Sequence, residues 1–321
     1  MPRTSMLTAL GAAALLTTVS GAAPAVAEDY GGGGEGESSS FEYTLPGVDV
    51  FPEGVDTSGR YFYVTSTTTG EVFRGELRDA DSAEVLLPGG EDGRTTAVGI
   101  EATDDLLLVA GGGTGILFVY DRSSADLLGR HTVPGDAATF LNDIAVTRAG
   151  DVYVTDSPRD VVYRIDEDDV RSDSELEVFA ELASLDPVGA FNANGIVAAR
   201  GGRYLIVVES DTGNLFRVST SDASVIPIAL DDDATVTAGD GLELKGRTLF
   251  VVRNSVGVIT ELRLGARLET GRIVGETTDP TFRFPTTAAL EGGRLLVVNS
   301  QFDQRGGNPE EPFTVSSIRR P

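Results

Sequence analysis

Apolar residues recur along most of the chain in short runs that alternate with polar positions. Runs such as 61–66 (YFYVTS) and 248–254 (TLFVVRN) are rich in β-branched and aromatic residues, and turns containing glycine separate them. Period-two alternation of this length is typical of half-buried strands, and no helix of consequence is expected. The pattern therefore predicts an all-β protein.

The strand pattern repeats six times after residue 50. One marker position precedes a glycine-aliphatic pair in four repeats and stands at the equivalent place in the other two. It can be followed at spacings of 45, 44, 52, 46 and 46: Glu53, Val98, Asn142, Asn194, Asp240 and Thr286. A period of 40–50 residues with several short strands per unit is typical of a β-propeller. We expect one six-bladed β-propeller over 40–321 with four-stranded antiparallel blades. Two β-sandwiches fit less well, because no linker interrupts the register.

The two ends of the propeller are predicted to share one blade. Segment 41–47 (FEYTLPG) resembles the fourth strands of the repeats, such as 83–89 (AEVLLPG), yet no inner strands precede it. We expect it to pair with the last strand, within 312–320 (PFTVSSIRR). This N-terminal strand would close the last blade and leave no sheet edge open.

Residues 1–27 have the features of a signal peptide: Arg3, an apolar stretch over 7–19 and a small-residue site ending at Ala27. The apolar stretch is shorter than the roughly 18 residues that a membrane span requires. Residues 28–39 are a Gly/Ser-rich tether with too little apolar surface to fold. We expect a secreted, extracytoplasmic monomer, cleaved near Ala27.

Composition excludes several chemistries. The chain has 25 Lys+Arg against 50 Asp+Glu, a formal net charge of −25, one histidine and no cysteine. Cysteine-zinc sites, iron–sulfur clusters, cysteine nucleophiles and poly-histidine metal centres are therefore ruled out. His131 falls in a predicted outer strand, where we expect an exposed residue. A surface with this much negative charge repels nucleic acid and anionic membranes but attracts cations. The expected partners are therefore metal ions and a small-molecule substrate.

Equivalent positions on the innermost strands of a propeller converge at one end of the central channel. Two of the chain's 7 asparagines stand at marker positions, together with two carboxylates. Glu53, Asn142, Asn194 and Asp240 would form an all-oxygen cluster suited to Ca²⁺ or another divalent ion. The ion could be catalytic or could only plug the channel, and the same groups could instead bind buried water.

The chain resembles the SMP-30/gluconolactonase/LRE-like family over residues 40–320. The resemblance rests on four motifs in order at blade spacing: 51–54 (FPEG), 141–143 (LND), 193–196 (ANGI) and 239–241 (GDG). It implies a calcium-dependent six-bladed propeller with Glu53, Asn194 and Asp240 as metal ligands. Asn142 would be a fourth ligand or a substrate contact.

The same resemblance implies a hydrolase of lactones or related esters. Calcium would act as a Lewis acid in the channel, and Asp240 would be the general base or the nucleophile. The alternative is a secreted, non-catalytic propeller in which calcium is structural.

One difference from the family bears on the substrate. Gluconolactonase-like members carry an arginine two residues before the first asparagine, where this chain has Phe140. We expect Phe140 to contact a hydrophobic lactone or ester in place of a sugar acid. Phe51, Phe191 and Phe284 stand at similar places, where they either surround the pocket or pack between blades.

Overall fold

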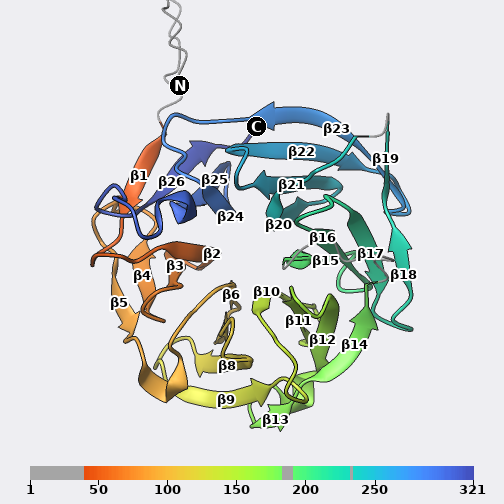
Figure 1. Cartoon of the computed structure of the whole chain (residues 1–321), viewed down its shortest axis with the longest axis horizontal. Coiled ribbons are helices and arrows are strands. Elements are labelled where there is room, and N and C mark those ends of the chain that lie inside the picture. The colour runs from red at the N-terminus through yellow and green to blue at the C-terminus, as the bar shows by residue number, and fades with distance from the viewer. Residues whose placement is uncertain (1–39, 183–190, 232–233) are drawn as a thin grey trace, which may run out of the picture. The chain divides into compact units, whose positions relative to one another are not determined.

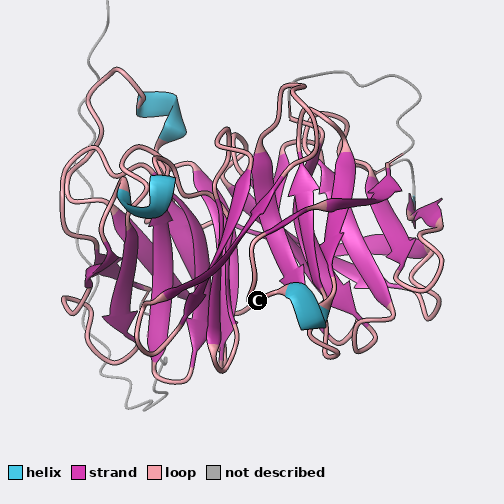
Figure 2. Ribbon diagram, turned by 90° about the horizontal axis from the view of Figure 1, so that it is seen from below, coloured by secondary structure: helices cyan, strands magenta, loops and turns pink. Residues whose placement is uncertain are grey.

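The computed structural model describes residues 40–182, 191–231 and 234–321. The predicted signal peptide (1–27) and tether (28–39) lie outside these ranges. The described residues form six small sheets around a common axis (Figure 1), and connecting loops gather at the two ends of the strands (Figure 2). The predicted six-bladed β-propeller is confirmed.

Each blade begins at the axis and ends at the outside of the ring. Blade 1 contains β2 (Pro52–Ser58), β3 (Tyr61–Ser66), β4 (Val72–Glu76) and β5 (Glu84–Leu87). Blade 2 contains β6 (Ile100–Ala102), β7 (Leu106–Ala110), β8 (Ile116–Asp121) and β9 (Leu127–Thr132). Blade 3 contains β10 (Leu141–Val146), β11 (Val152–Asp156), β12 (Val161–Ile165) and β14 (Glu177–Glu181).

The second half of the ring has the same plan. Blade 4 contains β15 (Ala193–Ala199), β16 (Tyr204–Glu209), β17 (Leu215–Ser219) and β18 (Val225–Pro227). Blade 5 contains β20 (Gly239–Lys245), β21 (Thr248–Arg253), β22 (Val258–Leu264) and β23 (Thr270–Thr277). Blade 6 contains β24 (Pro285–Glu291), β25 (Arg294–Asn299), β26 (Thr314–Arg319) and β1 (Phe41–Thr44).

Two blades have a fifth strand that the repeat pattern did not predict. β13 (Ser174–Glu175) pairs in parallel with β9, and β19 (Ala229–Leu230) pairs in parallel with β23. The described helices are short 3₁₀ turns: η1 (Glu91–Gly93), η2 (Glu167–Asp169) and η4 (Phe302–Gln304). Within the described ranges, no helix is long and apolar enough to cross a membrane.

The N-terminal strand closes the ring as predicted. β1 runs antiparallel to β26, with Phe41 opposite Ser317 and Thr44 opposite Thr314. Tyr43 and Leu45 are buried against blade 1 and blade 6 in a shared apolar cluster. This pairing joins the two ends of the described chain in one sheet.

Six apolar clusters hold the ring together, one between each pair of neighbouring blades. The alternating strands supply them, because each blade presents one apolar face to each neighbour. Burying one Val, Leu, Ile or Phe side chain contributes about 1.5–3 kcal/mol. Packing between blades is therefore the main source of stability.

Five of the six marker positions lie at irregularities in the inner strands. Register shifts interrupt β2 between Pro52 and Val55, and β10, β15, β20 and β24 at the equivalent place. A β-bulge turns a side chain away from the regular alternation. The glycine that follows a marker allows adjacent inner strands to approach closely, since a Cβ on Gly195 would lie 2.2 Å from the Asp240 carbonyl oxygen.

Half-buried carboxylates also join neighbouring inner strands. Asp56 Oδ2 accepts from Ala102 N at 2.7 Å, Asp143 Oδ2 from Ile196 N at 2.9 Å, and Glu243 Oε2 from Leu290 N at 3.2 Å. Each acceptor lies on one blade and each donor on the next. Burial raises the pKa of Asp56 to about 6 and the pKa values of Asp143 and Glu243 to about 7.

His131 lies on the outer strand β9, as predicted, but the expectation that it is exposed was wrong. Its side chain is fully buried, with Nδ1 2.8 Å from Ser174 Oγ and Nε2 3.1 Å from the Val170 carbonyl oxygen. The extra strand β13 covers it, which a count of four strands per blade did not anticipate. Burial lowers the pKa of His131, so it is a neutral packing residue outside the pocket.

Candidate functional site

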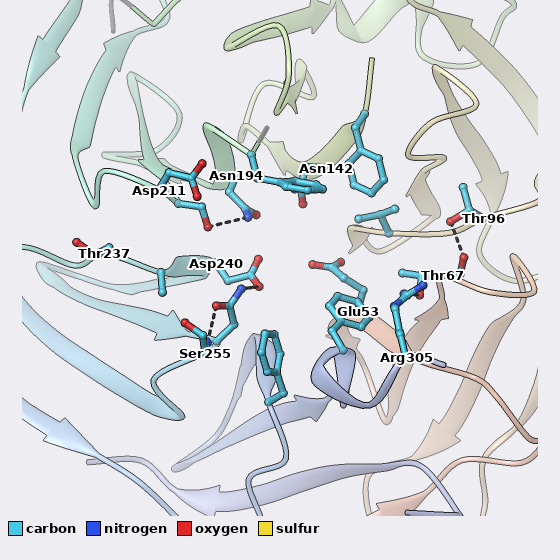
Figure 3. Close-up of a pocket in the computed structure, with 18 residues that line it drawn as sticks. Glu53, Thr67, Thr96, Asn142, Asn194, Asp211, Thr237, Asp240, Ser255 and Arg305 are labelled. Carbon is cyan, nitrogen blue, oxygen red and sulfur yellow. Dashed lines mark hydrogen bonds between the residues drawn. The ribbon is translucent and has the colours of Figure 1, made fainter. Parts of the chain in front are cut away.

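A pocket of about 630 Å³ opens at one end of the channel. Five of the six markers line it: Glu53, Val98, Asn142, Asn194 and Asp240. The four polar ones are only 4–6% exposed and form its floor, where their side chains point toward a common space (Figure 3). The sixth marker, Thr286, is turned away, because its hydroxyl donates to the Glu53 carbonyl oxygen at 2.8 Å.

Serine residues in the same blades fix the orientation of both floor asparagines. Ser157 Oγ donates to the Ala193 carbonyl oxygen at 2.7 Å and can then only accept from Asn142 Nδ2, at 2.9 Å. These hydrogen bonds determine which side of the Asn142 amide is the NH₂ group, so Asn142 Oδ1 points away from Ser157. Asn194 has the same arrangement, donating to Ser210 Oγ at 3.3 Å while Ser210 donates to the Gly239 carbonyl oxygen at 2.6 Å.

Two asparagine side chains form hydrogen bonds with the Asp240 carboxylate. Asn254 Nδ2 donates to Asp240 Oδ2 at 2.8 Å, and Asn254 Oδ1 accepts from Ser255 N, which fixes the direction of that amide. The Asn194 side chain also forms a hydrogen bond with the Asp240 carboxylate, which lowers the pKa of Asp240 as the Asn254 bond does. A carboxylate has about four lone-pair sites, so Asp240 can still accept a ligand while both amides hold it.

Two floor atoms have no partner among the described residues: Glu53 Oε2 and Asn142 Oδ1 are buried without a hydrogen bond. A buried acceptor without a donor costs about 1–3 kcal/mol, and more when it is charged. Both atoms belong to the same pocket floor, so one bound cation could satisfy both.

The electrostatics of the floor also favour a cation. Burial raises the pKa of Glu53 well above its usual range, and the nearby Asp240 and Asp143 carboxylates raise it further. Burial raises the pKa of Asp240 to about 7, although the hydrogen bond from Asn254 opposes this shift. A divalent cation would neutralise both carboxylates and allow them to remain ionised.

The donor set fits calcium. Among the described residues no group of three or more His, Cys, Asp or Glu side chains is arranged to hold a metal. The floor instead combines two carboxylates with two amide carbonyl groups from blades 1, 3, 4 and 5. All are hard oxygen donors of the kind that Ca²⁺ binds, with water completing its coordination.

Four phenylalanine side chains line the sides of the pocket. Phe140 and the exposed Phe191 meet edge to face with ring centroids 5.5 Å apart, and Phe284 and Phe302 line another part of the pocket. Of the four phenylalanines singled out in the sequence, three therefore line the pocket. Phe51 does not, because it is buried against Phe313 at a centroid distance of 5.0 Å.

Sequence reasoning brought the four floor residues and Phe140 to one place but missed the groups around them. Ser210 and Asn254 orient floor side chains, and Arg305 lines the pocket beside Phe302. The signal for the first two was available: a polar residue follows the second strand of the blade, 14–16 residues after the marker. Arg305 lies in a non-repeating loop, where the repeat gives no guidance.

Comparison with known proteins supports the fold. No model of a known protein family matches the chain, and no curated protein matches it. Solved structures do match. The major allergen Mala s 1 of Malassezia sympodialis is 14% identical with a TM-score of 0.66, covering 87% of this chain and 95% of that one.

Two further matches have known binding or enzymatic roles. A streptogramin B lyase is 13% identical with a TM-score of 0.61, covering 88% of this chain and 87% of that chain. Regucalcin from Agrobacterium tumefaciens, a calcium-binding protein, is 15% identical with a TM-score of 0.60, covering 88% and 93%. At these identities the matches establish the fold alone. The fold and pocket define a six-bladed β-propeller with an oxygen-rich floor at one end of its channel.

Proposed function

We propose that the protein is a calcium-dependent hydrolase of lactones or related esters, similar to the SMP-30/gluconolactonase-like proteins. One observation carries the proposal: Glu53 Oε2 and Asn142 Oδ1 are buried without partners in the same pocket as the Asp240 carboxylate. Calcium, or another divalent ion, would be held by Glu53, Asn142, Asn194 and Asp240.

When bound, the ion supplies Lewis-acid stabilisation of the negative charge that develops on the substrate carbonyl oxygen. The residues of the chain prepare the site for that chemistry. Ser157 and Ser210 accept hydrogen bonds from the side-chain NH₂ groups of the two asparagines. The side-chain carbonyl oxygens of these asparagines are therefore available to coordinate the ion. Glu53 and the two asparagines fix the site without exchanging protons with the substrate.

Asp240 is the proposed general base. Asn254 donates to Oδ2 and holds the carboxylate in place, so that it can accept a proton from the water that attacks the carbonyl carbon. As the ester C–O bond breaks, this proton can pass to the leaving alkoxide. The product is a hydroxy acid from a lactone, or an acid and an alcohol from an ester.

The aromatic sides indicate the kind of substrate. Phe140, Phe191, Phe284 and Phe302 offer apolar contacts to the body of a ligand. A pocket of about 630 Å³ is within the usual range for small-molecule sites. We therefore propose a hydrophobic lactone or ester as the substrate class.

The alternative is a secreted binding propeller with structural calcium. The position of the four floor residues on four different blades favours it, because one ion there would tie those blades together. In that case the ion stabilises the ring and the pocket only binds its ligand.

Hydrolysis assays separate the two functions. Purified protein would be incubated with sugar, aliphatic and aryl lactones and esters, with excess calcium and again after chelation. Calcium-dependent turnover supports the hydrolase and identifies its substrate class. No turnover on any substrate, together with a calcium-induced rise in melting temperature, supports the binding propeller.

We also propose that the protein is exported and cleaved after Ala27. The support is the sequence of residues 1–27. Intact-mass analysis of the protein recovered outside the producing cell tests this, and a mature chain beginning at Glu28 is expected. Recovery of the uncleaved chain from the cytoplasm alone would contradict it.

A further inference from the structure

Arg305 follows the short helix η4 and lines the pocket together with Phe302 (Figure 3). Its guanidinium carbon lies 4.3 Å from the centroid of the Phe302 ring and 5.0 Å from that of Phe51. Stacking of a guanidinium on two aromatic rings restricts its position while leaving its edge available to ligands. The rings of Phe302 and Phe51 therefore hold the Arg305 guanidinium in place.

The charge of Arg305 is not balanced by an acid. Among the described residues no carboxylate forms an ion pair with it, and its side chain donates a hydrogen bond to Thr67 Oγ1. In a chain with twice as many acidic as basic residues, acidic partners are plentiful. Burial lowers the pKa of Arg305, as expected for a cation that no carboxylate pairs with directly.

Arg305 is also the one cationic side chain among the described residues that line the pocket. The edge of its guanidinium that Thr67 does not occupy can donate two parallel hydrogen bonds to a planar oxyanion. The aromatic side chains of Phe140, Phe191 and Phe284 line the same cavity. One cavity therefore combines an unpaired cation with apolar surface.

We propose that Arg305 is a specificity residue that binds a carboxylate on a ligand whose remaining part is apolar. The floor would then act on a carbonyl group elsewhere in the same molecule, so the class of substrate is an apolar lactone or ester with a pendant carboxylate. The catalytic part of this inference rests on the proposed hydrolase function. The binding part does not, since it concerns Arg305 and the aromatic side chains.

A binding experiment tests the subsite without requiring turnover. The probes are phenylbutanoate and the uncharged phenylbutanamide, titrated calorimetrically into the calcium-saturated protein. We expect the carboxylate to bind roughly tenfold more tightly than the amide, as one charge-assisted hydrogen-bonded pair would give. Arg305→Gln should remove most of this preference, and Arg305→Lys should retain part of it because the charge remains without the planar fork.

The matched control is Arg263→Gln, which removes an exposed arginine on β22 outside the pocket. The Arg263→Gln variant should keep the wild-type preference for the carboxylate probe over the amide probe. That result would exclude a general effect of the protein's net charge on binding. An equal affinity for the two probes in the wild-type protein, or the same preference in Arg305→Gln, would overturn the proposal.

A kinetic experiment separates this inference from the proposed function. The ratio of kcat/KM for a carboxylate-bearing aryl lactone to that for its neutral amide analogue should fall about tenfold in Arg305→Gln. Turnover with an unchanged ratio would overturn the subsite while supporting the hydrolase. No turnover of either lactone, with the binding preference intact and dependent on Arg305, would overturn the hydrolase and support the subsite.

Discussion

Ser157 and Ser300 occupy equivalent positions after the second strands of blades 3 and 6, yet only Ser157 holds a floor side chain. Ser157 Oγ accepts from Asn142 Nδ2 at 2.9 Å and donates to the Ala193 carbonyl oxygen at 2.7 Å. Ser300 Oγ donates to the Phe284 carbonyl oxygen at 2.6 Å. The same turn has therefore been adapted in blade 3 to orient a candidate metal ligand.

Ser157→Ala should weaken calcium binding roughly 10- to 100-fold, because Asn142 loses the group that orients its amide. Ser300→Ala is the matched control. Ser157→Ala removes two buried hydrogen bonds and Ser300→Ala removes one, so they should cost about 2 and about 1 kcal/mol of folding stability. Calcium titration by calorimetry, with thermal unfolding alongside, measures both effects. Equal calcium affinities in the two variants would show that Ser157 has only a structural role.

Asp240→Asn should leave the protein folded and reduce kcat by between about a hundredfold and ten-thousandfold at saturating calcium. The amide keeps the size of the side chain and can still accept from Asn254, but it cannot take a proton from water. Asp303→Asn, on the exposed surface of η4, controls for loss of one negative charge. An Asp240→Asn variant with wild-type kcat would show that another group is the base.

Asp160→Asn should stabilise the protein at alkaline pH. Asp160 Oδ1 and Glu209 Oε1 are both buried without a hydrogen-bond partner among the described residues. Burial, followed by the charge of Glu209, raises the pKa of Asp160 to about 7. Because the folded pKa lies above the unfolded one, ionised Asp160 destabilises the protein as pH rises from about 4 through 7.

An asparagine at 160 carries no charge and can donate to Glu209. It also tolerates the left-handed backbone of Asp160, which has φ 55°. We expect a gain of about 1 kcal/mol at pH 8 that disappears near pH 4, measured by urea unfolding. A gain that does not change with pH would contradict the titration of Asp160.

Gly195→Ala should destabilise the ring by about 1–3 kcal/mol, the usual cost of overpacking. Its Cβ would lie 2.2 Å from the Asp240 carbonyl oxygen on the next blade, and backbone cannot move aside cheaply. Gly113→Ala provides the control, because a Cβ there would meet nothing within 4 Å. Similar denaturation midpoints for the two variants would contradict a role for Gly195 in the close approach of blades 4 and 5.

Features that repeat could be predicted from the sequence. The markers predicted the number of blades and the gathering of Glu53, Asn142, Asn194 and Asp240 at one pocket floor, and the likeness of segment 41–47 to the fourth strands predicted the closure by β1. Those predictions succeeded because equivalent positions in a propeller occupy equivalent places around one axis. That the four residues bind calcium remains a prediction.

Features that break the repeat could not be predicted in this way. The fifth strand β13 buries His131, and the long loop after β25 brings Arg305 onto the rings of Phe302 and Phe51. Each depends on a single irregular segment, so nothing elsewhere in the chain repeats the signal. Thr286 is an exception of another kind: it follows the repeat, but its hydroxyl donates to the Glu53 carbonyl oxygen and the residue does not line the pocket.

The most direct test of the account is calcium titration of the chelator-treated protein by isothermal calorimetry, repeated with Glu53→Gln. The buried Glu53 Oε2 and Asn142 Oδ1 predict one saturable calcium site in the wild-type protein and at least tenfold weaker binding in the variant. Absence of binding heat, with no calcium-dependent change in melting temperature, would contradict a metal site at the pocket floor.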